Sequence, residues 1–158
     1  MKLSFEIVPV FEKGFRTRIY TFRLNGEVYS EFKKFEINPK VISHPEFFTL
    51  ISRIDQIRNK YGCRMDWFKD ESEFYKIDAI KRILCGRGDL RLYCIRWSDS
   101  LLFLGDGGIK MPGTNRLQEN PPLLAIVKKL ESIYKELMDC MQDEGITIEE
   151  IIRRYSRR

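Results

Sequence analysis

The sequence predicts one α+β domain, in which a twisted antiparallel sheet is packed by three or four helices. Alternating apolar and polar residues near the N-terminus indicate strands, whereas apolar residues at helical spacing mark 43–61 and 121–141 as helices. The length of 158 residues fits a single domain with a sizeable core. We therefore expect residues 1–142 to form the α+β body and residues 143–158 to add a C-terminal helix and basic tail.

A three-stranded antiparallel meander is expected at the N-terminus. Leu3–Ile7 alternates between apolar and polar side chains, and Phe15–Leu24 does so again. Asn25 and Gly26 tolerate positive φ angles and favour a two-residue hairpin turn. The third strand then runs over residues 27–37.

A helix start is expected at Ser43, where three signals coincide. Ser43 can cap the helix, Pro45 is tolerated in its first turn, and Glu46 completes a capping box. Apolar residues at helical spacing continue to Tyr61, and Gly62 supplies the stop.

The middle of the chain mixes patterns. Cys63–Lys69 has the length of a short strand. Ser72–Leu84 carries apolar residues at helical spacing and suits a helix, with a strand around Phe74–Ile77 as the alternative. Leu90–Trp97 and Leu101–Leu104 follow as two strands around a turn.

The C-terminal part is expected to be helical. Residues 109–120 form a polar loop, and two prolines open a helix over 121–141. Gly145 breaks this helix, and Thr147 with Glu150 forms a capping box that starts a last short helix.

Charge and composition argue against several classes of protein. The net charge of +5 is a mild excess, and no apolar stretch reaches the roughly 20 residues of a membrane span. The N-terminus lacks the pattern of a signal peptide. Four cysteines show no metal-ligand spacing and His44 is the only histidine, so neither a zinc site nor a histidine-dependent hydrolase is expected. We expect a cytoplasmic protein that has no cofactor and no contact with a membrane.

A glycine cluster follows the second of the two central strands. Gly105, Asp106, Gly107 and Gly108 precede Lys110, and such a run can form a backbone nest for an anion. The spacing does not match a phosphate-binding loop. A tight turn or a bulge is the simpler interpretation.

The first central strand places Arg91 and Tyr93 on one face and Arg96 on the other. An arginine beside a tyrosine can hold a phosphate and stack on a base. The alternative is that Arg91 is an ion-pair partner and Tyr93 belongs to the core. The residues alone leave both interpretations open.

Basic residues gather around this strand, and six of them lie within thirty positions. They are Lys81, Arg82, Arg87, Arg91, Arg96 and Lys110. Such a cluster can contact an RNA backbone, with Lys81, Arg82, Arg87 and Tyr93 as candidate nucleic-acid ligands. Aspartates are interleaved with the cluster, so a solvated mixed surface is the alternative.

The order of a helical region, a glycine-containing loop, Leu-Arg-x-Tyr-x-Ile-Arg, an apolar strand and a lysine resembles the core of bacterial RelE/ParE-type toxins. The resemblance covers about Phe47–Lys110. It implies a small twisted antiparallel sheet packed by helices and a small antitoxin as partner. RelE-like members cut messenger RNA at the ribosome, and ParE-like members act on DNA gyrase.

The resemblance also implies a site and a function. Arg91 and Arg96 are expected to bind the scissile phosphate and neutralise its developing charge. Lys110 is expected to assist by electrostatics or proton transfer, and Tyr93 to stack on a base. The predicted function is that of a toxin-like, ribosome-dependent endoribonuclease.

The alternative function is a non-catalytic interaction module whose two C-terminal helices dock a partner or a second copy. Four positions discriminate between the two, namely Leu123, Val127, Leu130 and Ile151. If these side chains pack on the sheet, they leave no apolar face for a partner. The sequence carries no signal for the oligomeric state.

Overall fold

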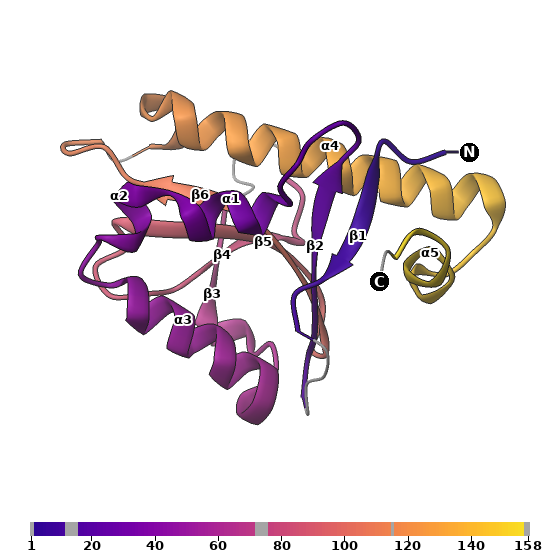
Figure 1. The fold of residues 1–158 in the computed structure, drawn as a ribbon, viewed down its shortest axis with the longest axis horizontal. Coiled ribbons are helices and arrows are strands. Elements are labelled where there is room, and N and C mark those ends of the chain that lie inside the picture. Colours follow the sequence, from indigo (N-terminus) through magenta and orange to yellow (C-terminus); the bar gives the residue numbers. More distant parts are fainter. Residues whose placement is uncertain (1, 12–15, 72–75, 115, 157–158) are drawn as a thin grey trace.

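A computed structural model describes residues 2–11, 16–71, 76–114 and 116–156, and every structural statement below refers to these. Its six-stranded sheet has the order β1-β2-β6-β5-β4-β3 and carries helices on both faces (Figure 1). The strands are β1 (Phe5–Pro9), β2 (Arg18–Leu24), β3 (Phe68–Asp70), β4 (Ile80–Ile83), β5 (Leu90–Ser98) and β6 (Leu101–Ile109). The helices are α1 (Glu31–Ile37), α2 (Pro39–Ile42), α3 (Phe47–Gln56), α4 (Pro121–Glu144) and α5 (Ile148–Tyr155). The predicted α+β class is confirmed.

The sheet is mixed, and this corrects the expectation of a wholly antiparallel one. β2 and β6 run parallel, with Arg18 opposite Leu101 and Thr21 opposite Leu104, whereas the other strand pairs are antiparallel. Parallel neighbours need a crossover connection. Here α1–α3 and the meander β3–β6 provide it, so that the last strand returns beside β2 (Figure 1).

The expected third strand over residues 27–37 is wrong, because this segment contains α1. The Ser30 side chain accepts a hydrogen bond from the Lys33 amide and caps the helix, and Phe32 and Phe35 are buried on its inner face. β2 already pairs with β1 on one side and β6 on the other. β2 therefore has no open edge on which a return strand could pair.

The expected helix start at Ser43 is also wrong. Ser43 ends α2, where its hydroxyl donates to the Pro39 carbonyl at 2.8 Å. The Glu46 carboxylate accepts from the Arg87 amide at 3.2 Å instead of completing a capping box. α3 begins only at Phe47.

The helix expected over Ser72–Leu84 is replaced by strand β4, whose four residues are all buried. β4 lies between β3 and β5 in the sheet. Residues 72–75, which include half of the alternative strand at Phe74–Ile77, lie outside the described part. Cys63–Lys69 contains a short 3₁₀ turn at Met65–Trp67 and the first residues of β3.

Two apolar layers hold the sheet between the helices. One lies between the sheet and α4–α5 and includes Phe22, Tyr93 and Phe103. The other lies between the sheet and α1–α3 and includes Leu50 and Ile54. Leu123, Val127, Leu130 and Ile151 are all buried in the first layer.

The C-terminal helices match the prediction. α4 begins at the two prolines and ends at Gly145, whose φ of 62° is the left-handed conformation that glycine adopts most easily. The Thr147 side chain accepts from the Glu150 amide and caps α5, as expected.

Candidate functional site

The glycine cluster lies inside strand β6 and forms a bulge. Cys94 pairs with Leu104 and Leu92 pairs with Gly107, so two residues of β6 stand opposite Tyr93 alone. A bulge bends a strand and re-aims the side chains that it contains. The bulge interpretation is confirmed, and the expectation of a tight turn is wrong.

Glycine is required here by the close approach of β5. A Cβ at position 107 would lie 1.9 Å from the Arg91 carbonyl oxygen, which no side chain can accommodate without a backbone shift. A Cβ at position 108 would meet only the Leu123 side chain at 3.2 Å. The end of β6 therefore presents bare backbone.

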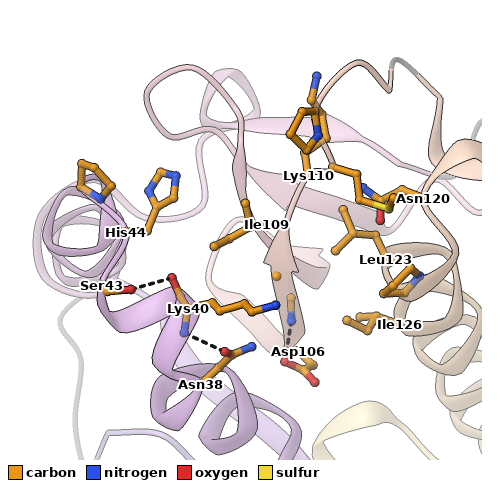
Figure 2. A pocket seen from close by; sticks show the side chains of 16 residues that line it. Asn38, Lys40, Ser43, His44, Asp106, Ile109, Lys110, Asn120, Leu123 and Ile126 are labelled. Carbon is orange, nitrogen blue, oxygen red and sulfur yellow. Dashed lines mark hydrogen bonds between the residues drawn. The ribbon is translucent and has the colours of Figure 1, made fainter.

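This bare backbone forms one wall of a pocket of about 760 Å³ (Figure 2). The other walls are α2 with the turn that follows it and the N-terminal end of α4. Its ionisable and amide side chains are Asn38, Lys40, His44, Asp106, Lys110 and Asn120. The volume falls in the range of small-molecule sites, which are about 300–1,000 Å³.

Asp106 is the acidic group of the pocket. One of its carboxylate oxygens accepts from the Gly107 amide at 2.7 Å. Burial outweighs this bond and raises the pKa of Asp106 to about 6. A carboxyl group with such a pKa can both take and return a proton near neutral pH.

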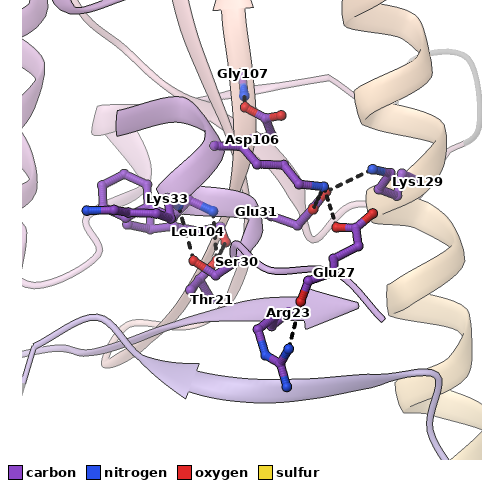
Figure 3. Close-up of polar contacts among 12 residues, drawn as sticks. Thr21, Arg23, Glu27, Ser30, Glu31, Lys33, Leu104, Asp106, Gly107 and Lys129 are labelled. Carbon is purple, nitrogen blue, oxygen red and sulfur yellow. Dashed lines mark hydrogen bonds and ion pairs between the residues drawn. The ribbon is translucent and has the colours of Figure 1, made fainter. Parts of the chain in front are cut away.

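A buried ion cluster lies beside Asp106, and its two lysines are already paired with glutamates (Figure 3). The Glu31 side chain is only 3% exposed and pairs with Lys34 at 2.7 Å and Lys129 at 3.3 Å. Lys34 also pairs with Glu27 at 2.5 Å. Both ammonium groups are thus held by these two glutamates.

His44 and two lysines supply donors to the same pocket. The His44 Nδ1 accepts from the Glu46 amide at 3.1 Å, so the neutral ring carries its proton on Nε2. Lys40 reaches across from α2 toward β6, and Lys110 stands at the end of the strand (Figure 2). Neither lysine side chain has an ion-pair partner in the part of the chain that the structure describes.

Asn120 is the least satisfied polar side chain of the pocket. It is 2% exposed, and neither its amide oxygen nor its amide nitrogen has a hydrogen-bond partner among residues 2–11, 16–71, 76–114 and 116–156. It occupies the N-cap position of α4, but its side chain makes no capping hydrogen bond. The two prolines that follow it have no N–H groups. Leaving such an amide unpaired costs about 1–3 kcal/mol.

The predicted nucleic-acid ligands lie elsewhere, around β4 and β5. Lys81 pairs with Asp70, and its side chain is only 4% exposed. Arg82 pairs with Glu71 at 2.5 Å and is 7% exposed. Arg87 is exposed on the loop between the two strands.

The predicted catalytic arginines are not brought together. The Arg91 Nε donates to the Gly88 carbonyl at 2.9 Å, whereas the Arg96 Nε donates to the Cys63 carbonyl at 2.8 Å and its guanidinium pairs with Asp99. The two positions lie on opposite faces of β5, about 16 Å apart along an extended strand. One phosphate therefore cannot contact both side chains in this arrangement.

Tyr93 is fully buried between the sheet and α4, and burial raises its pKa to about 12. This confirms the interpretation of Tyr93 as a core residue and contradicts its expected stacking on a base. Arg91 lies 4.0 Å from Glu71, which fits the ion-pair interpretation of that residue.

Of the three predicted catalytic residues, only Lys110 lines the pocket. Sequence reasoning missed Lys40, Asp106 and Asn120 as candidate functional residues. An aspartate within a glycine cluster and an asparagine before two prolines were the available signals.

The described residues contain no group of three or more His, Cys, Asp or Glu side chains placed to hold a metal ion. Within the same residues, no helix is long and apolar enough to cross a membrane. Comparisons with models of protein families, with curated proteins and with solved structures found no match to this chain.

Proposed function

We propose that this chain is a toxin-like protein of RelE/ParE type that cleaves RNA in the pocket at the end of β6. One observation carries the proposal. Asp106, whose pKa is raised to about 6, lines the same pocket as Lys40, His44 and Lys110. One acid–base carboxyl group among several N–H donors suits the transfer of a phosphodiester.

In the proposed reaction, the Asp106 carboxylate takes the proton of a ribose 2′-hydroxyl. The 2′-oxygen attacks the neighbouring phosphorus, and the bond from phosphorus to the 5′-oxygen of the next nucleotide breaks. Lys40 donates a proton to that leaving oxygen. The products are a 2′,3′-cyclic phosphate and a free 5′-hydroxyl.

Two further donors stabilise the charge that develops on the phosphate. The Lys110 ammonium contributes electrostatically, which keeps the role that the resemblance implies for it. The His44 Nε2–H donates to a phosphate oxygen. Arg91 and Arg96, which the resemblance assigns to the phosphate, act in this proposal by holding β5 and its neighbouring segments, because their guanidinium groups already contact protein atoms.

The chain order supports the RelE/ParE part of the proposal. A helical region and an antiparallel run of strands follow one another, and Lys110 comes directly after the last strand, as the resemblance implies. We infer that ribosome-bound messenger RNA is the substrate and that a small antitoxin protein inhibits the chain.

The experiment compares the purified chain with its Asp106→Asn variant on messenger RNA, with and without translating ribosomes. The wild-type chain is expected to cleave, and the variant to lose cleavage because it lacks the base. Asp139→Asn, on an exposed position of α4, is the matched control and is expected to cleave normally. Intact RNA with the wild-type chain, together with normal growth of a bacterial host that overexpresses it, would overturn the proposal.

The interaction module has less support. The four apolar side chains of α4 and α5 on which it depended are buried against the sheet. These positions therefore offer no apolar face to a partner.

A further inference from the structure

Asn120 lies at a different end of the pocket from Asp106 (Figure 2). Its side chain is almost completely buried, yet both amide atoms lack a partner in the described part of the chain. A buried amide in this state is destabilising, so its presence in the folded protein calls for a compensating role.

A helix cap is the usual role of an asparagine at this position, but Asn120 does not fill it. Its side chain makes no capping bond, and the first two residues of α4 are prolines without N–H groups. Its backbone is already used, because its N–H donates to Leu117 and its carbonyl accepts from Leu124. Only the side-chain amide remains available.

The surroundings of Asn120 suit a flat, partly apolar ring. Leu123 and Ile126 of α4 and Ile109 of β6 line the same pocket (Figure 2). Ligand sites commonly combine apolar walls with a few polar groups that fix orientation. A nucleobase has this combination of apolar faces and a polar edge.

We propose that Asn120 reads the base of the bound nucleotide and selects adenine. The amide oxygen accepts from the exocyclic N6–H, and the amide nitrogen donates to N7, which is the pairing that asparagine makes with adenine. The inference rests on the proposed function, in which the ribose and phosphate of the same nucleotide lie at the Asp106 end. Both amide atoms are closed off in the free protein, so binding includes a turn of the Asn120 side chain into the pocket.

The test measures binding of the four nucleoside 5′-monophosphates to the full chain by calorimetric titration. Wild-type protein is expected to bind adenosine monophosphate about tenfold more tightly than the other three. Asn120→Leu, of similar size, is expected to bind all four alike, and Asn59→Leu is the control at an asparagine outside the pocket. Without ligand, Asn120→Leu is expected to melt at a higher temperature, because it removes an unpaired buried amide.

The possible outcomes test the adenine inference and the proposed function separately. Equal affinity for the four nucleotides, preference for another base, no binding, or an unchanged preference in Asn120→Leu overturns the adenine inference. RNA cleavage that depends on Asp106 without adenine preference leaves the proposed function standing alone. Adenine preference without cleavage supports the base-reading role and overturns the proposed function.

Discussion

The cations of β4 and β5 and those of the β6 pocket differ in what surrounds them. Lys81 and Arg82 are buried in ion pairs with acidic partners. Lys40 and Lys110 line an open pocket, and the described residues offer their ammonium groups no ion pair. We infer that a basic residue of this fold has a ligand-binding role only where its charge is left unpaired. The first pair of cations should control stability, and the second should control binding.

The largest expected effect is on stability, at Arg82. Arg82→Ala removes the partner of Glu71, whose side chain is itself only 11% exposed. An uncompensated buried charge costs about 3–5 kcal/mol. Because Arg91 lies 4.0 Å from the same carboxylate and compensates in part, we expect a loss of about 3 kcal/mol, measured by urea unfolding.

Arg87→Ala is the matched control for Arg82→Ala, since Arg87 is exposed on the adjoining loop. Its free energy of unfolding is expected to change by less than about 0.5 kcal/mol. A loss below about 1 kcal/mol for Arg82→Ala would contradict the structural role of the buried pair.

The second-largest effect is expected at Gly107, in the wall of the pocket. In Gly107→Ala, the new Cβ would lie 1.9 Å from the Arg91 carbonyl oxygen, so the two strands must separate. We expect a loss of about 2 kcal/mol in thermal or urea unfolding. Gly108→Ala, whose Cβ meets only the flexible Leu123 side chain, should lose less than about 1 kcal/mol. Equal losses in the two variants would show that the close approach of β5 is not what requires glycine.

The elements that could be predicted are those with strong local signals. α4 begins at two prolines and ends at a left-handed glycine, and β1 follows its alternating pattern. The hairpin signal at Asn25 and Gly26 failed because it says nothing about which strand edges are already occupied. The parallel pairing of β2 with β6 joins residues about eighty positions apart, which no local pattern reports.

The site was predictable only in part, for a related reason. Lys110 was identified from its place after the glycine cluster, and it does line the pocket. The roles of Arg91 and Arg96 depend on contacts with Glu71 and Cys63, which tertiary folding alone brings near them. That the Asn120 amide has no hydrogen-bond partner among the described residues likewise depends on the tertiary structure, and no local pattern predicts it.

The third effect is a pH dependence of the free energy of unfolding, which we expect Asp106 of the pocket to cause. The pKa of Asp106 is about 6 in the folded protein, against an ordinary value of 3.8, because the group is buried. The folded state then binds more protons than the unfolded state between these pH values, so this group makes the free energy of unfolding fall as the pH rises from 4 to 6. Relative to Asp106→Asn, the wild type should lose about 2 kcal/mol over this window.

Urea unfolding of both proteins at several pH values measures this difference, and the other carboxyl groups cancel in the subtraction. RNA cleavage should rise over the same range, because the base acts when deprotonated. A constant stability difference between the two proteins would show that Asp106 titrates normally.

The smallest effect on stability is expected at Lys110, one of the two lysines of the pocket. Its ammonium group has no ion-pair partner in the described structure, so Lys110→Ala should change the free energy of unfolding by less than about 0.5 kcal/mol. The same substitution removes a positive charge from the pocket, and RNA cleavage should fall by about tenfold or more. Lys128→Ala, exposed on α4, removes the same charge outside the pocket and should leave cleavage unchanged. If both lysine variants lower cleavage equally, the effect is one of overall charge. That result would contradict the proposed role of Lys110 at the phosphate.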